Sequence, residues 1–163
     1  MDLLVGGFPD SDSRPSIAEG FLRLRATAAE VGVSATQWVD GSFVTSKLNP
    51  GDIDVVSFIH SDVLDKLDAP GRQFVVETLA AGPKAKPRYR TDSYFVPVYD
   101  STHPFFAQYE SVRSYWRKWF GRGRPTAGTN GETPDGPHKG MLEIGLGFEH
   151  LRPTVPAWED DAT

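Results

Sequence analysis

The sequence predicts an α/β or α+β domain in which helices flank a mixed sheet. Residues 17–31 repeat apolar side chains at helical spacing, whereas residues 53–59 form a continuous apolar run that is typical of a central strand. The predicted elements follow the order helix, strand, turn, strand, helices, strand, helix, strand, which favours helices packed on a sheet. With 163 residues and 39% hydrophobic side chains, the chain suits a single domain over residues 1–163.

The first third of the chain is predicted to hold an irregular lead-in, one helix and one short strand. Residues 1–15 are rich in Gly, Pro, Asp and Ser and are expected to be irregular. Ser16 and Glu19 have the spacing of a capping box, and Gly32 is expected to end the helix. The helix carries an apolar stripe expected to be core: Ile17, Phe21, Leu24, Ala28 and Val31. A short strand is predicted over residues 37–40.

Two helices and a second strand are predicted after the central strand. The helices are expected over residues 62–67, with Asp62 as N-cap, and over residues 70–80, with Pro70 in the first turn. The strand is expected over residues 93–99 and is opened by Asp92.

The last third is predicted to hold an aromatic helix, a long loop, a strand and a tail. The helix begins at Pro104 and ends at Gly121, and its stripe is expected to be core, with base stacking as the alternative for one exposed ring. The stripe consists of Phe105, Tyr109, Val112, Trp116 and Trp119, widened by Tyr115 and Phe120. Residues 121–138 form a Gly- and Pro-rich loop, residues 141–146 a strand, and residues 153–163 an acidic tail.

The most informative motif is Gly41-Ser42 followed by Asp52-Ile53-Asp54. Residues two apart on a strand face the same way, so both carboxylates are expected on one face. Carboxylates so close repel unless a cation lies between them, and Mg²⁺ prefers such oxygen ligands. The Gly-Ser turn offers amides and a hydroxyl to a phosphate. The alternative is structural, because Asn-Pro-Gly-Asp at residues 49–52 also makes an ordinary turn.

This Gly-Ser…Asp-x-Asp pattern resembles the signature of the polymerase-beta-like nucleotidyltransferase superfamily. The longer stretch over residues 39–54, with the final strand over residues 139–147, is similar to an uncharacterised family of short bacterial nucleotidyltransferase-like proteins. The resemblance implies a nucleotidyltransferase-like mixed sheet. It also implies that Gly41 and Ser42 bind nucleotide phosphate.

The resemblance further implies a catalytic metal site. Asp52 and Asp54 would hold Mg²⁺ or Mn²⁺, and a third carboxylate would come from a neighbouring strand. Asp92 is the best match in the order of elements, with Glu143 in reserve.

Basic residues near these positions are candidate contacts for a triphosphate or a nucleic-acid backbone. Lys84, Lys86, Arg88 and Arg90 alternate with other residues and would share one face if the segment were extended. Lys47, in the Gly-Ser loop, is a further candidate. The alternative is a charged, solvated sheet edge that prevents aggregation.

These features predict a Mg²⁺-dependent nucleotidyltransferase that moves an NMP group from a nucleoside triphosphate to a hydroxyl of a small molecule, a protein or RNA. The alternative is an antitoxin or partner-binding protein of a toxin–antitoxin or phage-defence module, with or without catalysis. Nucleotidyltransferase-like antitoxins that pair with a helical protein usually carry Arg-Gly directly after Gly-Ser. This chain has Phe43-Val44 at that place and so departs from the pattern of that subgroup.

The composition argues against several other classes of protein and binding site. The net charge of −5 does not favour indiscriminate nucleic-acid binding, and the absence of cysteine excludes disulfides and thiolate zinc sites. The four histidines have no zinc-site spacing. Neither a signal-peptide pattern nor an apolar stretch of membrane-spanning length is visible, so the expected location is cytoplasmic.

Overall fold

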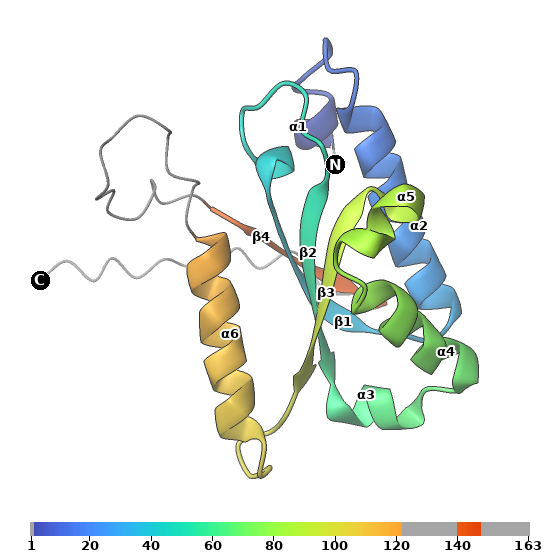
Figure 1. The fold of residues 1–163 in the computed structure, drawn as a ribbon, viewed down its shortest axis with the longest axis vertical. Coiled ribbons are helices and arrows are strands. Elements are labelled where there is room, and N and C mark those ends of the chain that lie inside the picture. The colour runs from blue at the N-terminus through green and yellow to red at the C-terminus, as the bar shows by residue number, and fades with distance from the viewer. Residues whose placement is uncertain (1, 122–139, 148–163) are drawn as a thin grey trace, which may run out of the picture.

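The computed structural model describes residues 2–121 and 140–147, which form an α+β fold around a four-stranded mixed sheet (Figure 1). The strands are β1 Ala35–Asp40, β2 Ile53–His60, β3 Thr91–Val98 and β4 Leu142–Leu146, in the order β3-β2-β1-β4. β1 runs antiparallel to both β2 and β4, whereas β2 and β3 are parallel. The predicted fold class is confirmed.

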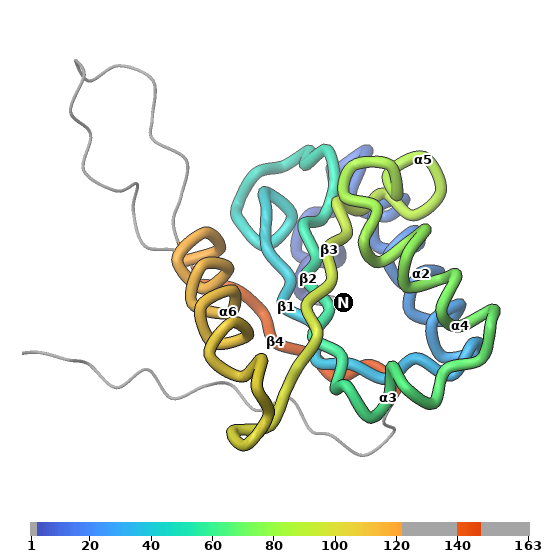
Figure 2. Tube along the Cα trace, turned by 60° about the horizontal axis from the view of Figure 1, so that its bottom comes forward, coloured from blue at the N-terminus to red at the C-terminus, as the bar shows by residue number. Residues whose placement is uncertain are grey.

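The helices lie on both faces of this sheet. They are α1 Asp2–Val5, α2 Arg14–Glu30, α3 Ser61–Lys66, α4 Ala69–Phe74, α5 Lys86–Tyr89 and α6 Phe106–Phe120, with 3₁₀ turns η1 Ser42–Val44 and η3 Pro83–Ala85 and a π turn η2 Val75–Leu79. Figure 2 shows α2, α4 and α5 on one side of the sheet and α6 on the other. The described elements therefore form three layers.

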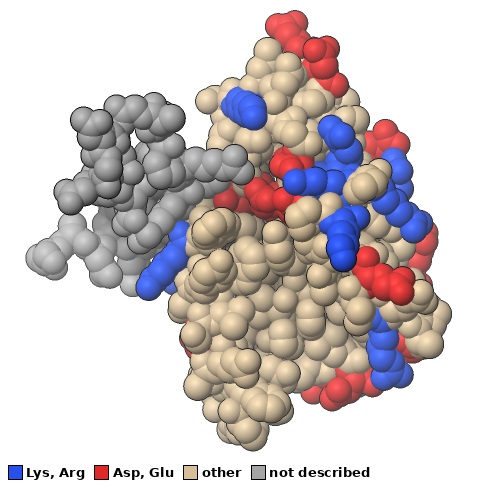
Figure 3. Space-filling model, viewed as in Figure 1, with Lys and Arg blue, Asp and Glu red and all other residues tan. Residues whose placement is uncertain are grey.

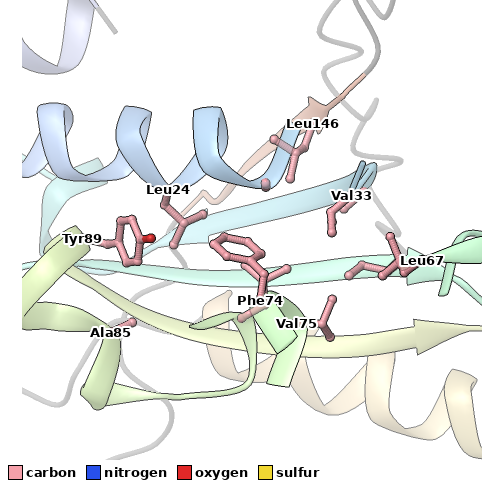
Figure 4. Packing of buried hydrophobic residues seen from close by; sticks show 12 residues of the cluster. Leu24, Val33, Leu67, Phe74, Val75, Ala85, Tyr89 and Leu146 are labelled. Carbon is pink, nitrogen blue, oxygen red and sulfur yellow. The ribbon is translucent and has the colours of Figure 1, made fainter. Parts of the chain in front are cut away.

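The face under α2 carries most of the buried apolar residues. Ile17, Phe21, Leu24 and Ala28 are at most 2% exposed, which confirms the predicted stripe at these four positions. In Figure 4, Leu24 lies close to Phe74 and Tyr89 between α2 and the sheet. Gly32 has φ +76°, the left-handed conformation that commonly ends a helix.

The opposite face is covered by α6. Trp38, Val56 and Phe120 are buried there, and Tyr109 and Trp116 are partly buried against them. The expectation is that most of the aromatic stripe of α6 is core, and four of its seven members pack in this cluster: Tyr109, Val112, Trp116 and Phe120. Its exposed members are Phe105, Tyr115 and Trp119, at 53%, 55% and 63% exposure. The aromatic stripe is wider than the contact that one helix makes with the sheet, so its flanks remain in solvent.

Several predicted boundaries are wrong. Residues 1–15 are not wholly irregular, because they hold α1 and the first turn of α2. The N-cap of α2 is Ser13 rather than Ser16, since Pro15 fits the first turn, and the Ser16 hydroxyl donates to the Ser13 carbonyl. The N-cap of α3 is His60 rather than Asp62.

The helix expected over residues 70–80 is α4 continued by the π turn. Its N-cap is Asp68, whose carboxylate accepts a hydrogen bond from the Gly71 amide at 2.9 Å. The predicted loop beyond Gly121 and the tail over residues 153–163 lie outside the described residues.

Candidate active site

Three aspartates form a row across adjacent strands at one end of the sheet. Asp40 on β1 lies opposite Asp54 on β2, and Asp54 lies opposite Asp92 on β3. Residues paired across a sheet share a face, so the three side chains leave the sheet on the same side. That side faces α6, because Trp38, two residues before Asp40, is buried in the cluster that includes Phe120. The structure therefore brings Asp54 and Asp92 together.

Asp40 was missed by the sequence analysis, which treated it only as the end of a strand. It is 3% exposed, whereas Asp54 and Asp92 are half-buried. The available signal was its place directly before Gly41-Ser42 and two residues after a tryptophan that faces the core. Its position opposite Asp54 depends on the register of β1 against β2, which the sequence does not give.

Lys86 lies between two of the predicted metal ligands. Its ammonium nitrogen donates to Oδ2 of Asp52 at 2.7 Å and to Oδ2 of Asp92 at 2.9 Å. These hydrogen bonds, that to Asp52 first, raise the pKa of Lys86 well above its ordinary value of 10.5. A side-chain cation thus balances two carboxylates where a divalent ion was expected.

The other predicted cations do not join Lys86. The segment over residues 84–90 is helical rather than extended, since Pro83 and Pro87 fit the first turns of η3 and α5. The expectation that its four cations share one face is therefore wrong. Lys84 and Arg88 are exposed, as is Lys47 in the Gly-Ser loop.

The Gly41-Ser42 turn passes directly over Asp54. Gly41 has φ +87°, and a Cβ atom at this position would overlap Oδ2 of the Asp54 carboxylate. Only glycine combines this backbone conformation with such a close approach. Ser42 follows as the first residue of η1 and is half-buried. The predicted phosphate-binding turn therefore adjoins the aspartate row.

Glu143, the reserve ligand, has a different partner. It lies opposite Trp38 in the sheet, and its Oε2 accepts a hydrogen bond of 2.7 Å from the indole nitrogen. This pair lies one row away from Asp40, because same-face neighbours on a strand are two residues apart. Among the described residues, Asp40 and Asp92 both lie directly beside Asp54 in the sheet register, whereas Glu143 does not.

The carboxylates of this site are the type of ligand that a hard divalent cation prefers, but they are not arranged around one. Within residues 2–121 and 140–147, no three acidic, His or Cys side chains have the geometry of a metal site. Lys86 takes one oxygen each from Asp52 and Asp92. The other Asp92 oxygen, Oδ1, is buried and has no hydrogen-bond partner in the described part of the chain. A buried, unsatisfied carboxylate oxygen fits an additional ligand.

An acidic surface marks this end of the molecule. Figure 3 shows acidic side chains gathered at the end of the sheet, with basic side chains next to them on the α5 side. Tyr94, two residues after Asp92, packs on Trp116 of α6 with ring centroids 4.7 Å apart. Burial, and then the charges of Asp92 and Asp54, raise the pKa of Tyr94. An aromatic side chain therefore borders the acids.

Comparison with protein families gives one match, which covers residues 1–145. The matching model describes a family of unknown function, DUF6932. The chain belongs to this family. Searches of curated proteins and of solved structures gave no match. In the described part of this DUF6932 protein, no helix is long and apolar enough to cross a membrane.

Proposed function

We propose that this DUF6932 protein is a nucleotidyltransferase that uses Mg²⁺ or Mn²⁺ to transfer an NMP group from a nucleoside triphosphate to a hydroxyl acceptor. The acceptor class is a small molecule, a protein or RNA. The observation that carries the proposal is the row of Asp40, Asp54 and Asp92 directly beside the Gly41-Ser42 turn. Carboxylates next to a backbone turn provide oxygen ligands for a divalent cation and donors for phosphate within one small site.

Each part of the site has a role in this proposal. Asp52, Asp54 and Asp92 would hold the divalent cation, which would neutralise phosphate charge and acidify the acceptor hydroxyl. Asp40 lies beside Asp54 and adds negative charge that favours a cation over a neutral ligand. The Ser42 hydroxyl and the neighbouring amides bind phosphate oxygens.

The transfer step is a displacement at the α-phosphorus. The acceptor oxygen forms a bond to phosphorus, the bond to pyrophosphate breaks, and the acceptor proton passes to Oδ1 of Asp92. This oxygen is left open by Lys86, which binds Oδ2, and it has no hydrogen-bond partner among the described residues.

Lys86 would occupy different positions in the ligand-free site and in the site that holds a cation and a triphosphate. Its side chain is 39% exposed, so it can leave Asp52 and Asp92 without opening the core. If Asp52 and Asp92 were to hold a cation, the Lys86 ammonium group would be left without these two partners, close to the site. A triphosphate there would give it a new anionic partner.

A transfer assay tests the proposal. Wild type and Asp54→Asn are incubated with Mg²⁺, cell extract and α-³²P-labelled ATP, GTP, CTP or UTP, with Asp65→Asn as the control. Asp65 is an exposed acid on α3, so its loss removes the same charge elsewhere. We expect label on an acceptor with wild type and Asp65→Asn but not with Asp54→Asn. Equal labelling by all three proteins, or none by any, contradicts the proposal.

A second candidate function is binding of a protein partner, such as a toxin, without catalysis. The observation that favours it is the pair of exposed rings on α6, Tyr115 and Trp119, whose centroids lie 6.2 Å apart with nearly parallel planes. Exposed aromatic rings are enriched where proteins meet. Replacing both with serine would abolish capture of such a partner and leave nucleotide transfer unchanged.

A further inference from the structure

Arg14 is a charged residue in the core. It belongs to the first turn of α2, and its side chain is 0% exposed. Within the described residues, no carboxylate forms an ion pair with it. Burial lowers its pKa by removing the guanidinium from water. A buried charge is costly unless its hydrogen-bond donors are satisfied, so this guanidinium requires acceptors close by.

All five guanidinium donors contact backbone carbonyl groups. Nη1 donates to Leu4 at 2.7 Å and to Phe43 at 2.8 Å. Nη2 donates to Thr45 and Lys47, both at 2.7 Å, and Nε donates to Leu48 at 3.3 Å. Four of these five carbonyl groups belong to residues 43–48, the segment that follows Gly41-Ser42. The guanidinium thus supplies the hydrogen bonds that a segment outside the sheet lacks.

Aromatic rings and Asn49 complete this connection. The guanidinium carbon lies 3.6 Å from the ring centroid of Phe8 and 5.2 Å from that of Phe43. Oδ1 of Asn49 accepts hydrogen bonds from the Ser11 hydroxyl at 3.0 Å and the Asp12 amide at 2.9 Å. The segment over residues 43–49 is therefore attached along its length to Arg14 at the start of α2 and to residues 11–12 just before it.

We propose that Arg14 is a positioning residue for nucleotide binding: it holds residues 43–49 in the shape that presents Ser42 to the triphosphate. This inference rests on the proposed function. Arg14 does not itself touch the phosphates, because it is buried and its donors are all used. The preorganised loop lowers the cost of ordering on binding.

The test combines hydrogen exchange with nucleotide binding in Arg14→Lys. Lysine keeps the charge but offers three donors where five carbonyl groups are held. Arg25→Lys is the matched control, because Arg25 also lies on α2, is partly buried, and donates to Gln37 and to the Gly145 carbonyl of β4. We expect Arg14→Lys to speed amide exchange of residues 43–49 at least tenfold. We also expect it to weaken binding of Mg²⁺ with a fluorescent ATP analogue at least tenfold, and Arg25→Lys to do neither.

Asn49→Ala provides a second variant if Arg14→Lys does not fold. Asn49 is exposed, and its loss removes only the second attachment. We expect faster exchange of the loop and an affinity loss of several fold in a folded protein. Unchanged loop exchange in these variants, or equal acceleration in Arg25→Lys, overturns the inference. If wild type binds no nucleotide, the proposed function fails, and faster loop exchange in Arg14→Lys would then leave only a structural role.

Discussion

Replacing Lys86 with methionine should weaken the fold and strengthen cation binding at the same time. Methionine keeps the unbranched apolar stem as far as Cε but removes the ammonium group that Asp52 and Asp92 share. The two carboxylates then repel each other without a cation between them. Lys84→Met is the control, because Lys84 lies two residues away and is exposed.

The expected loss follows from the geometry of the two ion pairs. A hydrogen bond to a charged group contributes about 1.5–3 kcal/mol, whereas an exposed ion pair contributes about 0–1 kcal/mol. The side chains of Lys86, Asp52 and Asp92 are 39%, 26% and 15% exposed, so these ion pairs are neither fully buried nor fully exposed. Solvent screening reduces the contribution of such half-exposed pairs. We therefore expect Lys86→Met to lower the free energy of unfolding by about 1–2 kcal/mol in urea titrations without divalent ions.

Divalent ions should reverse this loss. In wild type a cation must displace the ammonium group, whereas in Lys86→Met it need not. An advantage of about 1.4 kcal/mol corresponds to about tenfold tighter Mg²⁺ binding, measurable by isothermal calorimetry. Lys86→Met that is as stable as Lys84→Met, or that binds Mg²⁺ no better than wild type, would refute this reasoning.

The contribution of Lys86 and its two carboxylate partners to the free energy of unfolding depends on pH. Because folding raises the pKa of Lys86 above 10.5, its contribution to stability is complete below that pH and is lost as the pH rises from about 10.5 toward the higher folded value. The stability difference between wild type and Lys86→Met should be constant from about pH 6 to 9 and shrink above about 10.5. A difference that changes between pH 6 and 9 would mean that another group is responsible.

Three further predictions concern the surroundings of the site. Gly41→Ala should destabilise the protein by about 1–3 kcal/mol in urea unfolding, because Gly41 has positive φ and contacts Asp54, whereas Gly51→Ala, where a Cβ meets nothing within 4 Å, should change stability by less than about 0.5 kcal/mol. Asp40→Asn should weaken Mn²⁺ binding about tenfold in calorimetry; an affinity equal to wild type would remove Asp40 from the site. Trp38→Phe should cost about 1–2 kcal/mol by leaving Glu143 without its indole donor, and a double-mutant cycle with Glu143→Ala that shows no coupling would disprove that account.

Local sequence patterns predicted much of the fold. The apolar spacing of α2 and the continuous apolar run of β2 depend only on neighbouring residues, and both elements are present. The alternating cations over residues 84–90 would share one face only in an extended segment, and the segment is helical. The two prolines in the first turns of short helices were the stronger signal.

Only those residues of the candidate site that are recognisable within one strand were predictable from the sequence. Asp52 and Asp54 are recognisable because they lie on one strand, and Asp92 because it opens the next. Asp40 was missed, and Lys86 was predicted as a triphosphate contact rather than as the partner of Asp52 and Asp92. Both positions depend on tertiary packing, through strand register and a helical turn. Arg14 was hidden in a segment expected to be irregular, and its carbonyl partners are more than 28 residues away in four of five cases.

Paramagnetic broadening by Mn²⁺ in ¹⁵N-labelled protein tests the central claim most directly, because it locates a bound cation without any assumption about acceptor or nucleotide. We predict that substoichiometric Mn²⁺ first broadens the amide signals of Gly41, Asp54 and Asp92, and that Mg²⁺ in excess restores them. Broadening that is strongest at the exposed acids of α3, Asp62 and Asp65, or spread evenly over acidic side chains, would contradict a divalent-cation site at the aspartate row.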